Sequence, residues 1–364
     1  MIENVTRLTV RYNDRVVGFL ERLRDGRIAF QYSETWVKEG FSLSPFSLPL
    51  SDQVYVSSSE YFEGLHGVFY DSLPDGWGEY LTRKTLMEQG ISYDKVNVLT
   101  KLSLVNHHGL GGLEYVPSQS KEEKKATLKL DDLAAHVEAA LNNDIVKTDL
   151  DALYLVGGAS GGARPKVYIA DEKDAWIVKF PALLDPKNMG QCEFDANACA
   201  KRCGIHVNEF KLFPSKKSPG YFGAKRFDRV GETRMHVISL AALLETTHRI
   251  PTLDYTHFFQ VIQRICVDQD DLYEAFKRMS FNVLYGNKDD HGKNMAFYYD
   301  EARKGYRLSP FYDITKTPDK LEHEMTVLGQ GRPTEADLLK LAKQFNLSLS
   351  HCQNIIRKID SIIT

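Results

Sequence analysis

The segment from residue 270 to residue 313 constrains the fold of this chain more than any other. Its first part, DLYEAFKRMSFNVLYGN, repeats apolar residues at helical spacing and ends at Gly286, a residue type that commonly terminates helices. The next ten residues, GNKDDHGKNM, gather two acids, a histidine, two lysines and two amides. Two strand-like segments follow, NMAFYYD and GYRLSPFYD. The pattern predicts a buried helix, a polar loop and a hairpin in direct succession.

The predicted hairpin brings three polar residues to one end. If its centre lies near residue 303, Asn294 lies beside Tyr312 and Asp313, and Asp289 lies close to both. Carboxylate and amide oxygens are ligands that magnesium accepts. The spacing from Asp289 to Asn294 is D-x-x-x-x-N, which in protein kinases separates the acid that accepts the substrate proton from an asparagine that holds magnesium. This short pattern is common in loops, so by itself it leaves a solvated loop as the alternative.

Other parts of a phosphoryl-transfer site occur upstream in the order that kinases use. The segment GGASGGARPKVYIA places four glycines around Ser160, and backbone amides without side chains can approach phosphate oxygens closely. Lys179 lies inside the apolar strand AWIVKFP, where a lysine needs an anionic partner or access to solvent. Glu193 opens the next predicted helix and could pair with it. Taken singly, these features also fit a glycine-rich turn, a sheet-edge lysine and a helix-start acid.

Composition places the chain among globular proteins and excludes several functions. Its 364 residues, 43% of them apolar, are enough for two or three packed units. The 46 Lys and Arg nearly balance the 49 Asp and Glu, so no overall basic charge predicts direct binding to DNA or to a membrane. No segment is apolar enough to span a bilayer. The five cysteines contain no C-x-x-C, and we expect a reduced, cytoplasmic protein.

The hydrophobic patterns predict an α+β chain with at least one linker. Residues 5–56 read as short strands, and residues 61–104 are mainly helical, with a helix that starts near Pro74 and Asp75. The polar segment 117–127, PSQSKEEKKAT, is typical of a linker. A helix, short strands and another helix follow to about residue 228, and the remainder is mainly helical apart from the hairpin. Trp77 is expected to pack where the two parts of the chain meet.

Together these motifs resemble those of the HipA family of serine/threonine kinases, the toxins of bacterial toxin–antitoxin modules. The matching motifs run over nearly the whole chain: LPDGWGEYL, GLGGLEY, GGARPK, IVKFP, AKRFDR, RMHVISLAALL, NKDDHGKNM and LSPFYDIT. The resemblance implies an α+β, bilobal protein-kinase-like fold. It also implies three domains, namely an α/β accessory domain at 1–116, a β-rich N-lobe at 127–228 and a mainly helical C-lobe at 229–364.

The resemblance further implies an ATP- and Mg²⁺-dependent kinase that binds ATP between its lobes. Asp289 would be the catalytic base, Asn294 and Asp313 the magnesium ligands, and Lys179 a contact of the ATP phosphates. The backbone of residues 225–227 would hold the adenine. The full set of residues implied in ATP binding is Ser160, Gly161, Gly162, Lys179, Glu193, Lys225, Phe227 and Asp228.

Two further expectations follow from the resemblance. Some family members carry an autophosphorylated serine in the glycine-rich loop, but here that position is Ala159, so Ser160 is open to three interpretations: a phosphosite, a phosphate donor or a small loop residue. A helix-turn-helix, HipB-like antitoxin is the implied partner and would supply the DNA contacts. Family members phosphorylate aminoacyl-tRNA synthetases, which makes such a protein a candidate substrate.

Two other classes of function remain open on the sequence alone. The first is a catalytically weak or dead nucleotide-binding homologue that acts as an antitoxin-binding corepressor. The second is a metal-dependent hydrolase built on Asp289, Asp290 and His291, which would require metal ligands from elsewhere and would leave Lys179 without a role.

Overall fold

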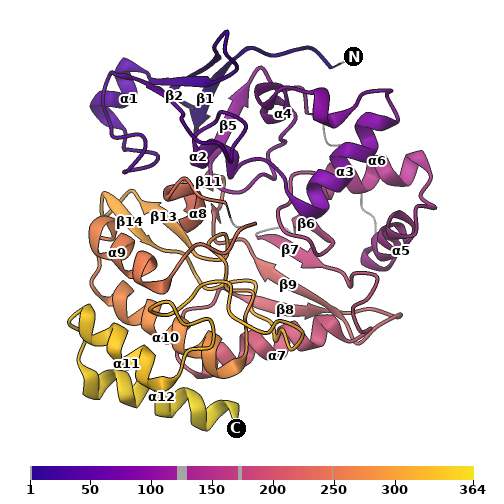
Figure 1. Cartoon of the computed structure of the whole chain (residues 1–364). Helices are drawn as coiled ribbons and strands as arrows, with labels where there is room; N and C mark the ends of the chain where they lie inside the picture. Colours follow the sequence, from indigo (N-terminus) through magenta and orange to yellow (C-terminus); the bar gives the residue numbers. More distant parts are fainter. Residues whose placement is uncertain (1, 121–128, 171–173, 248) are drawn as a thin grey trace. The chain divides into compact units, whose positions relative to one another are not determined.

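The computed structural model describes residues 2–120, 129–170, 174–247 and 249–364 (Figure 1). It mixes helices with antiparallel sheets, so the predicted α+β class is confirmed. The predicted linker at 117–127 lies largely outside the described residues. The chain divides into two compact units. The first unit comprises Met1–Gln191 and Phe210–His236, and the second comprises Cys192–Glu209 and Val237–Thr364.

A five-stranded antiparallel sheet opens the first unit and confirms the strands expected between residues 5 and 56. Every second residue of the first strand points into the core, and Leu8, Val10 and Tyr12 are almost fully buried. Asn13 and Asp14, with φ of 44° and 66°, form the tight turn to the second strand. The sheet order is β4-β3-β2-β1-β5, with β1 (Arg7–Tyr12), β2 (Arg15–Arg22), β3 (Ile28–Tyr32), β4 (Val54–Val56) and β5 (Leu113–Val116).

The helices of the first unit include two that local pattern did not predict, α1 and α6. The predicted helix at Pro74 and Asp75 is confirmed, because Asp75 is the N-cap of α3. Helix α6 was missed although Leu150, Leu153 and Tyr154, which are buried, follow a helical spacing, because the adjacent glycine-rich segment is the dominant local signal. The helices are α1 (Glu34–Glu39), α2 (Gly67–Tyr70), α3 (Gly76–Met87), α4 (Val98–Ser103), α5 (Leu130–Leu141) and α6 (Lys147–Gly157).

A second antiparallel sheet shares one core with α3, α5 and α6. Its order is β6-β7-β9-β8, with β6 (Lys166–Ala170), β7 (Ala175–Lys179), β8 (Phe210–Phe213) and β9 (Tyr221–Lys225). Trp77 of α3 is buried in this core beside residues of the helices and of the sheet. The expected packing role of Trp77 is therefore confirmed. Burial of such a large side chain supplies much hydrophobic free energy at one place.

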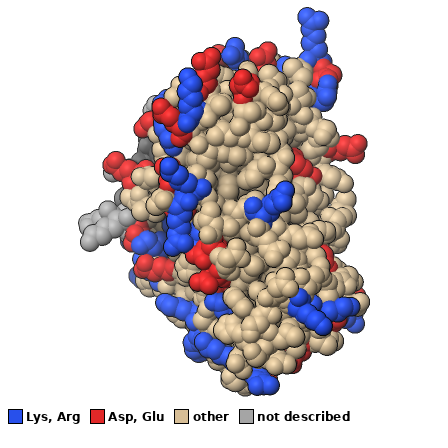
Figure 2. Space-filling view, turned by 90° about the vertical axis from the view of Figure 1, so that its left-hand side faces the viewer, with Lys and Arg blue, Asp and Glu red and all other residues tan. Residues whose placement is uncertain are grey.

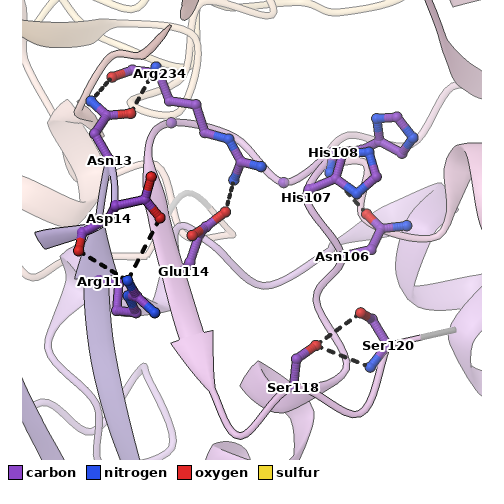
Figure 3. Close-up of polar contacts among 12 residues, drawn as sticks. Arg11, Asn13, Asp14, Asn106, His107, His108, Glu114, Ser118, Ser120 and Arg234 are labelled. Carbon is purple, nitrogen blue, oxygen red and sulfur yellow. Dashed lines mark hydrogen bonds and ion pairs between the residues drawn. The ribbon is translucent and has the colours of Figure 1, made fainter. Parts of the chain in front are cut away.

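A short hairpin, β10 (Arg229–Val230) and β11 (Thr233–Arg234), ties this sheet region to the N-terminal sheet. The amide of Asn13 brackets the backbone of Arg234: Nδ2 donates to the Arg234 carbonyl at 2.8 Å, and the Arg234 N–H donates to Oδ1 at 3.0 Å (Figure 3). The guanidinium of Arg234 pairs with Glu114 of β5 at 2.8 Å. The N-terminal strands and residues 210–236 thus belong to one unit.

The second unit is mainly helical around a three-stranded sheet. Its aromatic core includes Phe258, Phe276 and Phe297, all fully buried. The sheet order is β12-β13-β14, with β12 (Val237–Ser239), β13 (Ala296–Asp300) and β14 (Gly305–Leu308). The helices are α7 (Met189–Arg202), which begins in the first unit, α8 (Leu240–Leu243), α9 (Tyr255–Ile265), α10 (Asp270–Tyr285), α11 (Glu335–Gln344) and α12 (Leu349–Ile363).

The helix, loop and hairpin predicted from residues 270–313 are all present. Helix α10 ends at its cap Gly286, which has φ of 81° and donates its N–H to the Asn282 carbonyl at 3.0 Å. In the hairpin, Phe297 pairs with Leu308 and Asp300 with Gly305, so the centre falls between residues 302 and 303. The predicted register near residue 303 is therefore confirmed.

The surface carries charges of both signs. On the face that Figure 2 shows, Lys and Arg are scattered among Asp, Glu and many uncharged residues, without a continuous basic region. This distribution agrees with the near balance of charged residues in the sequence. Among the described residues, none of the helices combines the length and the apolar character that crossing a membrane requires.

Gly286 generates a stability prediction. A Cβ at this position would meet no atom within 4 Å, so the cost of Gly286→Ala comes from the left-handed backbone alone. We expect the free energy of unfolding to fall by about 1 kcal/mol. Gly286→Asn should cost less, because asparagine tolerates this conformation. Urea unfolding of both variants measures the difference, and equal losses for Ala and Asn would contradict the backbone explanation.

Candidate active site

In the second unit, the polar loop after α10 is built around the buried carboxylate of Asp290. The Asp290 side chain has no exposed surface and accepts hydrogen bonds from Tyr255 Oη at 2.8 Å and from the Glu324 N–H at 3.0 Å. His323 Nδ1 lies 2.9 Å from the same carboxylate. A buried carboxylate needs such partners, because its desolvation is costly. Its oxygens are thus occupied by protein, which leaves Asp290 unsuited to the metal-ligand role that the hydrolase alternative requires.

A chain of side-chain hydrogen bonds connects Asp290 to the end of α10. The Asn287 amide donates to Asn282 Oδ1 at 2.8 Å, and Asn282 Nδ2 donates to Tyr255 Oη at 2.9 Å. Tyr255 in turn donates to Asp290. Burial raises the pKa of Tyr255 well above its usual value, and the nearby Asp290 charge acts in the same direction. The phenol therefore stays protonated as a donor.

A second segment, residues 317–325, lies along the loop, and we call it the strap. The Lys288 N–H donates to Thr317 Oγ1 at 2.8 Å, and Lys288 Nζ donates to the Lys320 carbonyl at 2.6 Å. The Glu324 N–H also lies 3.2 Å from the Lys288 carbonyl, and the Thr317 N–H donates to the Gly286 carbonyl at 3.1 Å. Loop and strap are therefore held together at several points between residues 286 and 290.

The strap places a lysine on Asp289. Lys320 Nζ donates to Asp289 Oδ1 and, at 2.8 Å, to Glu324 Oε1. Partial burial lowers the pKa of Lys320, but the hydrogen bonds to Asp289 and Glu324 outweigh it and raise the pKa above the usual lysine value. The side chain of Asp289 is 39% exposed. Adjacent aspartates thus differ sharply: Asp290 is enclosed, whereas Asp289 reaches solvent.

Asn294 contacts the backbone of Asp289. Its Nδ2 donates to the Asp289 carbonyl at 2.7 Å, and its N–H donates to the His291 carbonyl at 2.9 Å. The hairpin brings Tyr312 back to this loop, where Tyr312 Oη donates to the Lys293 carbonyl at 2.6 Å. Asp313 follows with φ of 53°, in the left-handed region that aspartate tolerates better than most residues. Asp289, Asn294 and Asp313 therefore belong to one loop–hairpin unit.

In the first unit, the glycine-rich segment runs from the end of α6 to β6. Ser160 is fully buried, and its hydroxyl donates to the Gly157 carbonyl at 2.7 Å. Gly161 and Gly162 are exposed. The Gly162 N–H donates to the carboxylate of Asp75, and Lys166 Nζ donates to the Gly161 carbonyl at 2.6 Å. The start of α3 therefore holds this loop.

Lys179 and Glu193 occupy different units. Lys179 ends β7, is partly buried, and its ammonium lies 5.7 Å from the ring centre of Phe222. Glu193 lies in α7, is 1% exposed, and its carbonyl accepts a hydrogen bond from Asn197 Nδ2 at 2.8 Å. A Lys179–Glu193 pair stays a prediction.

The residues of segment 225–228 make more contacts within the protein than the sequence predicted. Lys225 closes β9 and pairs with Asp174 at 2.7 Å, and the Arg226 N–H donates to the Ala175 carbonyl at 2.7 Å. Phe227 follows in a turn and is partly buried. The strand pairing thus uses one of the backbone groups expected to hold adenine. The adenine-binding role of this segment stays a prediction.

Asp228 is the centre of a buried ionic cluster. Its carboxylate accepts from Arg226 at 2.6 Å, from Arg229 at 2.8 Å and from the Gly111 N–H at 2.8 Å. Burial alone would raise the pKa of Asp228, but the two arginines and the amide hold it at about 2. Arg226 also donates to the carbonyls of residues 108 and 109. Asp228 and its two arginines therefore connect the segment after β9 to residues 107–111.

The sequence did not predict three features of the glycine-rich segment and of the polar loop after α10. These are the contact of Asp75, the contact of Lys320 and the burial of Asp290. Asp75 was recognised only as a helix start, 87 residues from its partner Gly162. Lys320 gave no signal, because nothing in LSPFYDITKTPDKLEHE marks one lysine above the other. Asp290 was visible in the motif, but adjacent acids do not reveal which one is buried.

Comparisons with known proteins agree with this architecture. The family model described as HipA N-terminal domain matches residues 8–116, and the one described as HipA-like C-terminal domain matches residues 158–364. A structure of HipA, HipB and operator DNA from Shewanella oneidensis MR-1 superposes with a TM-score of 0.74 at 18% identity. It covers 98% of this chain and 88% of that chain. The predicted kinase-like fold of this family is therefore confirmed.

Two curated relatives come from Sinorhizobium fredii (strain NBRC 101917 / NGR234). The protein named "Putative kinase Y4dM" is 26% identical over 342 residues, which cover 88% of this chain and 80% of the relative. The protein named "Putative kinase Y4mE" is 24% identical over 348 residues, which cover 85% of this chain and 77% of the relative. Similarity to both relatives therefore extends over most of the chain.

The ionic cluster around Asp228 predicts a large effect of Asp228→Ala on stability. Asp228→Ala leaves buried Arg226 and partly buried Arg229 without their anion, and we expect a loss of about 3–5 kcal/mol in the free energy of unfolding. Asp94→Ala, which removes a solvent-exposed partner of Arg83, should leave stability nearly unchanged. Because the folded pKa of Asp228 is depressed, its contribution is present above the ordinary pKa of 3.8 and is lost as the pH falls toward 2. Thermal unfolding of both variants checks this, and equal effects would contradict it.

Proposed function

The chain belongs to the HipA family, and from this premise we propose that it is an ATP- and magnesium-dependent kinase that phosphorylates a serine or threonine of a protein. One observation carries the proposal: Asp289 reaches solvent at the end of a rigid loop, and Asn294 is bonded to its backbone at 2.7 Å. A solvent-accessible carboxylate whose backbone is bonded to a nearby asparagine suits a hydroxyl nucleophile and an ATP–metal complex.

Asp289 is assigned the role of general base. It orients the hydroxyl of the protein substrate and accepts its proton as the hydroxyl oxygen attacks the γ-phosphorus of ATP. Its backbone is bonded to Asn294, its neighbour Asp290 is bonded to the strap, and its carboxylate accepts a hydrogen bond from Lys320, so several contacts position the carboxylate. Such pre-organisation is a large part of catalysis in phosphoryl transfer.

The residues present fit magnesium. The amide nitrogen of Asn294 is used by the Asp289 carbonyl, and within the described part of the chain its Oδ1 accepts no hydrogen bond. Asn294 is 8% exposed, so the side chain that carries this oxygen is largely enclosed. Asn294 and Asp313 would hold the ion, a donor set of amide and carboxylate oxygens that magnesium accepts. Bound magnesium would neutralise charge on the ATP phosphates.

The first unit is assigned the nucleotide contacts. Lys179 would neutralise the ATP phosphates, and exposed Gly161 would approach them through its backbone N–H. The Gly162 N–H is donated to Asp75, so a phosphate contact of Gly162 would have to replace that bond. Ser160 is fully buried with its hydroxyl bonded to Gly157, which favours its role as a small loop residue over that of a phosphosite. The contacts of Glu193, Lys225, Phe227 and Asp228 with ATP stay predictions.

We also propose a HipB-like antitoxin as partner and the cytoplasm as the place of action. The Shewanella oneidensis MR-1 structure is titled as a complex of HipA, HipB and operator DNA, which supports a partner of the same kind here. The balanced charge of the chain is consistent with DNA contacts made by the antitoxin. An aminoacyl-tRNA synthetase is the first candidate substrate to test.

The base and metal assignments predict the effects of two substitutions. Asp289→Asn and Asp313→Asn should each lower phosphate transfer from γ-labelled ATP by about 10²–10⁴-fold, since the first removes the base and the second removes the negative charge of a magnesium ligand. The control Asp319→Asn changes an exposed acid that lies between Asp313 and Lys320 in the sequence, and it should retain activity. Unchanged circular dichroism shows that the fold persists. Full transfer by both variants would contradict the assignment.

The partner assignment predicts stable co-purification. If a small helix-turn-helix protein is encoded beside this chain, a tagged copy of the chain expressed with it should retain that protein through size-exclusion chromatography. The complex should bind a DNA fragment from upstream of the two coding sequences, and the chain alone should not. Binding of that DNA by the chain alone would overturn the indirect-contact proposal. A dead corepressor would pass this test yet transfer no phosphate.

A further inference from the structure

Lys320 is placed to take part in the reaction that we have proposed. Its ammonium has three N–H donors, and two of them go to Asp289 and Glu324. Within the described part of the chain, Lys320 is the cation paired with Asp289. Its side chain is 35% exposed, so the third donor can reach a bound molecule. Nothing in the family motifs quoted above includes this lysine.

We propose that Lys320 is a catalytic residue of the phosphoryl transfer, and this inference rests on the proposed kinase function. Its third N–H would donate to an oxygen of the γ-phosphoryl group as that group passes to the substrate hydroxyl. Its other two N–H groups would stay on Asp289 and Glu324. Lys320 would thus touch both the base and the group transferred.

Charge explains why a cation is needed at this place. Asp289 and the γ-phosphoryl group are both anionic, yet they must approach the same hydroxyl. An ammonium between them reduces their repulsion and stabilises the charge that the phosphoryl oxygens carry in the transition state. The second carboxylate, Glu324, keeps the ammonium protonated and in place when substrate is absent, in agreement with its raised pKa.

The strap fixes Lys320 before substrate arrives. Its own carbonyl is bound by Lys288 Nζ at 2.6 Å, and its N–H lies 3.2 Å from the Thr317 carbonyl. At the other end, His323 and the backbone of Glu324 bond to buried Asp290. Two neighbouring lysines are engaged differently, because Lys288 holds the strap and Lys316 lies 4.9 Å from the ring centre of Tyr285.

The step balances without any further reactant. The hydroxyl oxygen of the substrate forms a bond to the γ-phosphorus, and the bond from that phosphorus to the β–γ bridging oxygen breaks. The bridging oxygen leaves with the electron pair as part of ADP, and the hydroxyl proton passes to Asp289. Lys320 transfers no proton, so its effect is electrostatic and depends on its positive charge.

Three variants of the full-length chain test the inference. Lys320→Met removes the charge, Lys320→Arg keeps it, and Lys316→Met is a matched control four residues earlier that also loses one positive charge. The assay follows label from γ-labelled ATP into a fixed extract of bacterial proteins across a range of ATP concentrations, which gives an apparent kcat and a KM for ATP. Thermal unfolding of each variant accompanies the kinetics.

We expect Lys320→Met to lower kcat by about 10²-fold, the effect of losing one transition-state donor, with little change in KM. Lys320→Arg should recover most of the rate, and Lys316→Met should match the wild type. A purely structural lysine would not give this split between kcat and KM or this rescue by arginine. If Lys320→Met unfolds, Lys320→Gln serves as the neutral variant and must show the same loss.

Other results overturn the inference. If the wild type is active and both neutral variants keep kcat within threefold, Lys320 has no catalytic role and the proposed kinase function stands. A higher kcat in the neutral variants would mean that Lys320 obstructs Asp289, which also overturns it. A wild-type chain that transfers no phosphate to the extract would overturn the proposed function and this inference with it.

Discussion

The second unit depends on one buried carboxylate, that of Asp290. An unpaired charge in this position would be strongly unfavourable, and four groups compensate it: a phenol, an imidazole and two backbone N–H groups of the strap. Because these partners come from α9 and from residues 323–325, one side chain fixes the polar loop against two other segments. Asp289 and Lys320 take their positions from this arrangement.

Each unit contains a buried carboxylate whose charge must be compensated, and the compensating groups differ between the units. In the first unit, buried Asp228 is neutralised by two arginines, which also bind carbonyls of residues 107–109. In the second, Asp290 is satisfied by neutral donors and by His323. Both carboxylates act as structural centres, and in both cases the neighbouring segment carries residues of the proposed reaction. Removal of either would affect activity through position.

Local sequence predicted those features that local physics determines. The helical period of α10, its end at Gly286 and the register of the hairpin all follow from residue spacing and turn residues. These features put Asp289 in the loop and Asn294 at the start of the hairpin. Contacts between distant segments were not predictable in this way. The bonds from Asp228 to Gly111 and from Asp75 to Gly162 join residues 117 and 87 positions apart, and only the folded chain brings them together. The burial of Ser160 was likewise not predictable from local sequence.

The central claim is that this chain transfers the γ-phosphoryl group of ATP to a protein hydroxyl. The most direct test incubates the purified protein and a bacterial extract with ATP labelled either at the γ- or at the α-phosphorus, with magnesium or with a chelator. We predict label on protein serine or threonine from γ-labelled ATP only, and none in the presence of the chelator. Label from the α-position, or no label under any condition, would contradict it.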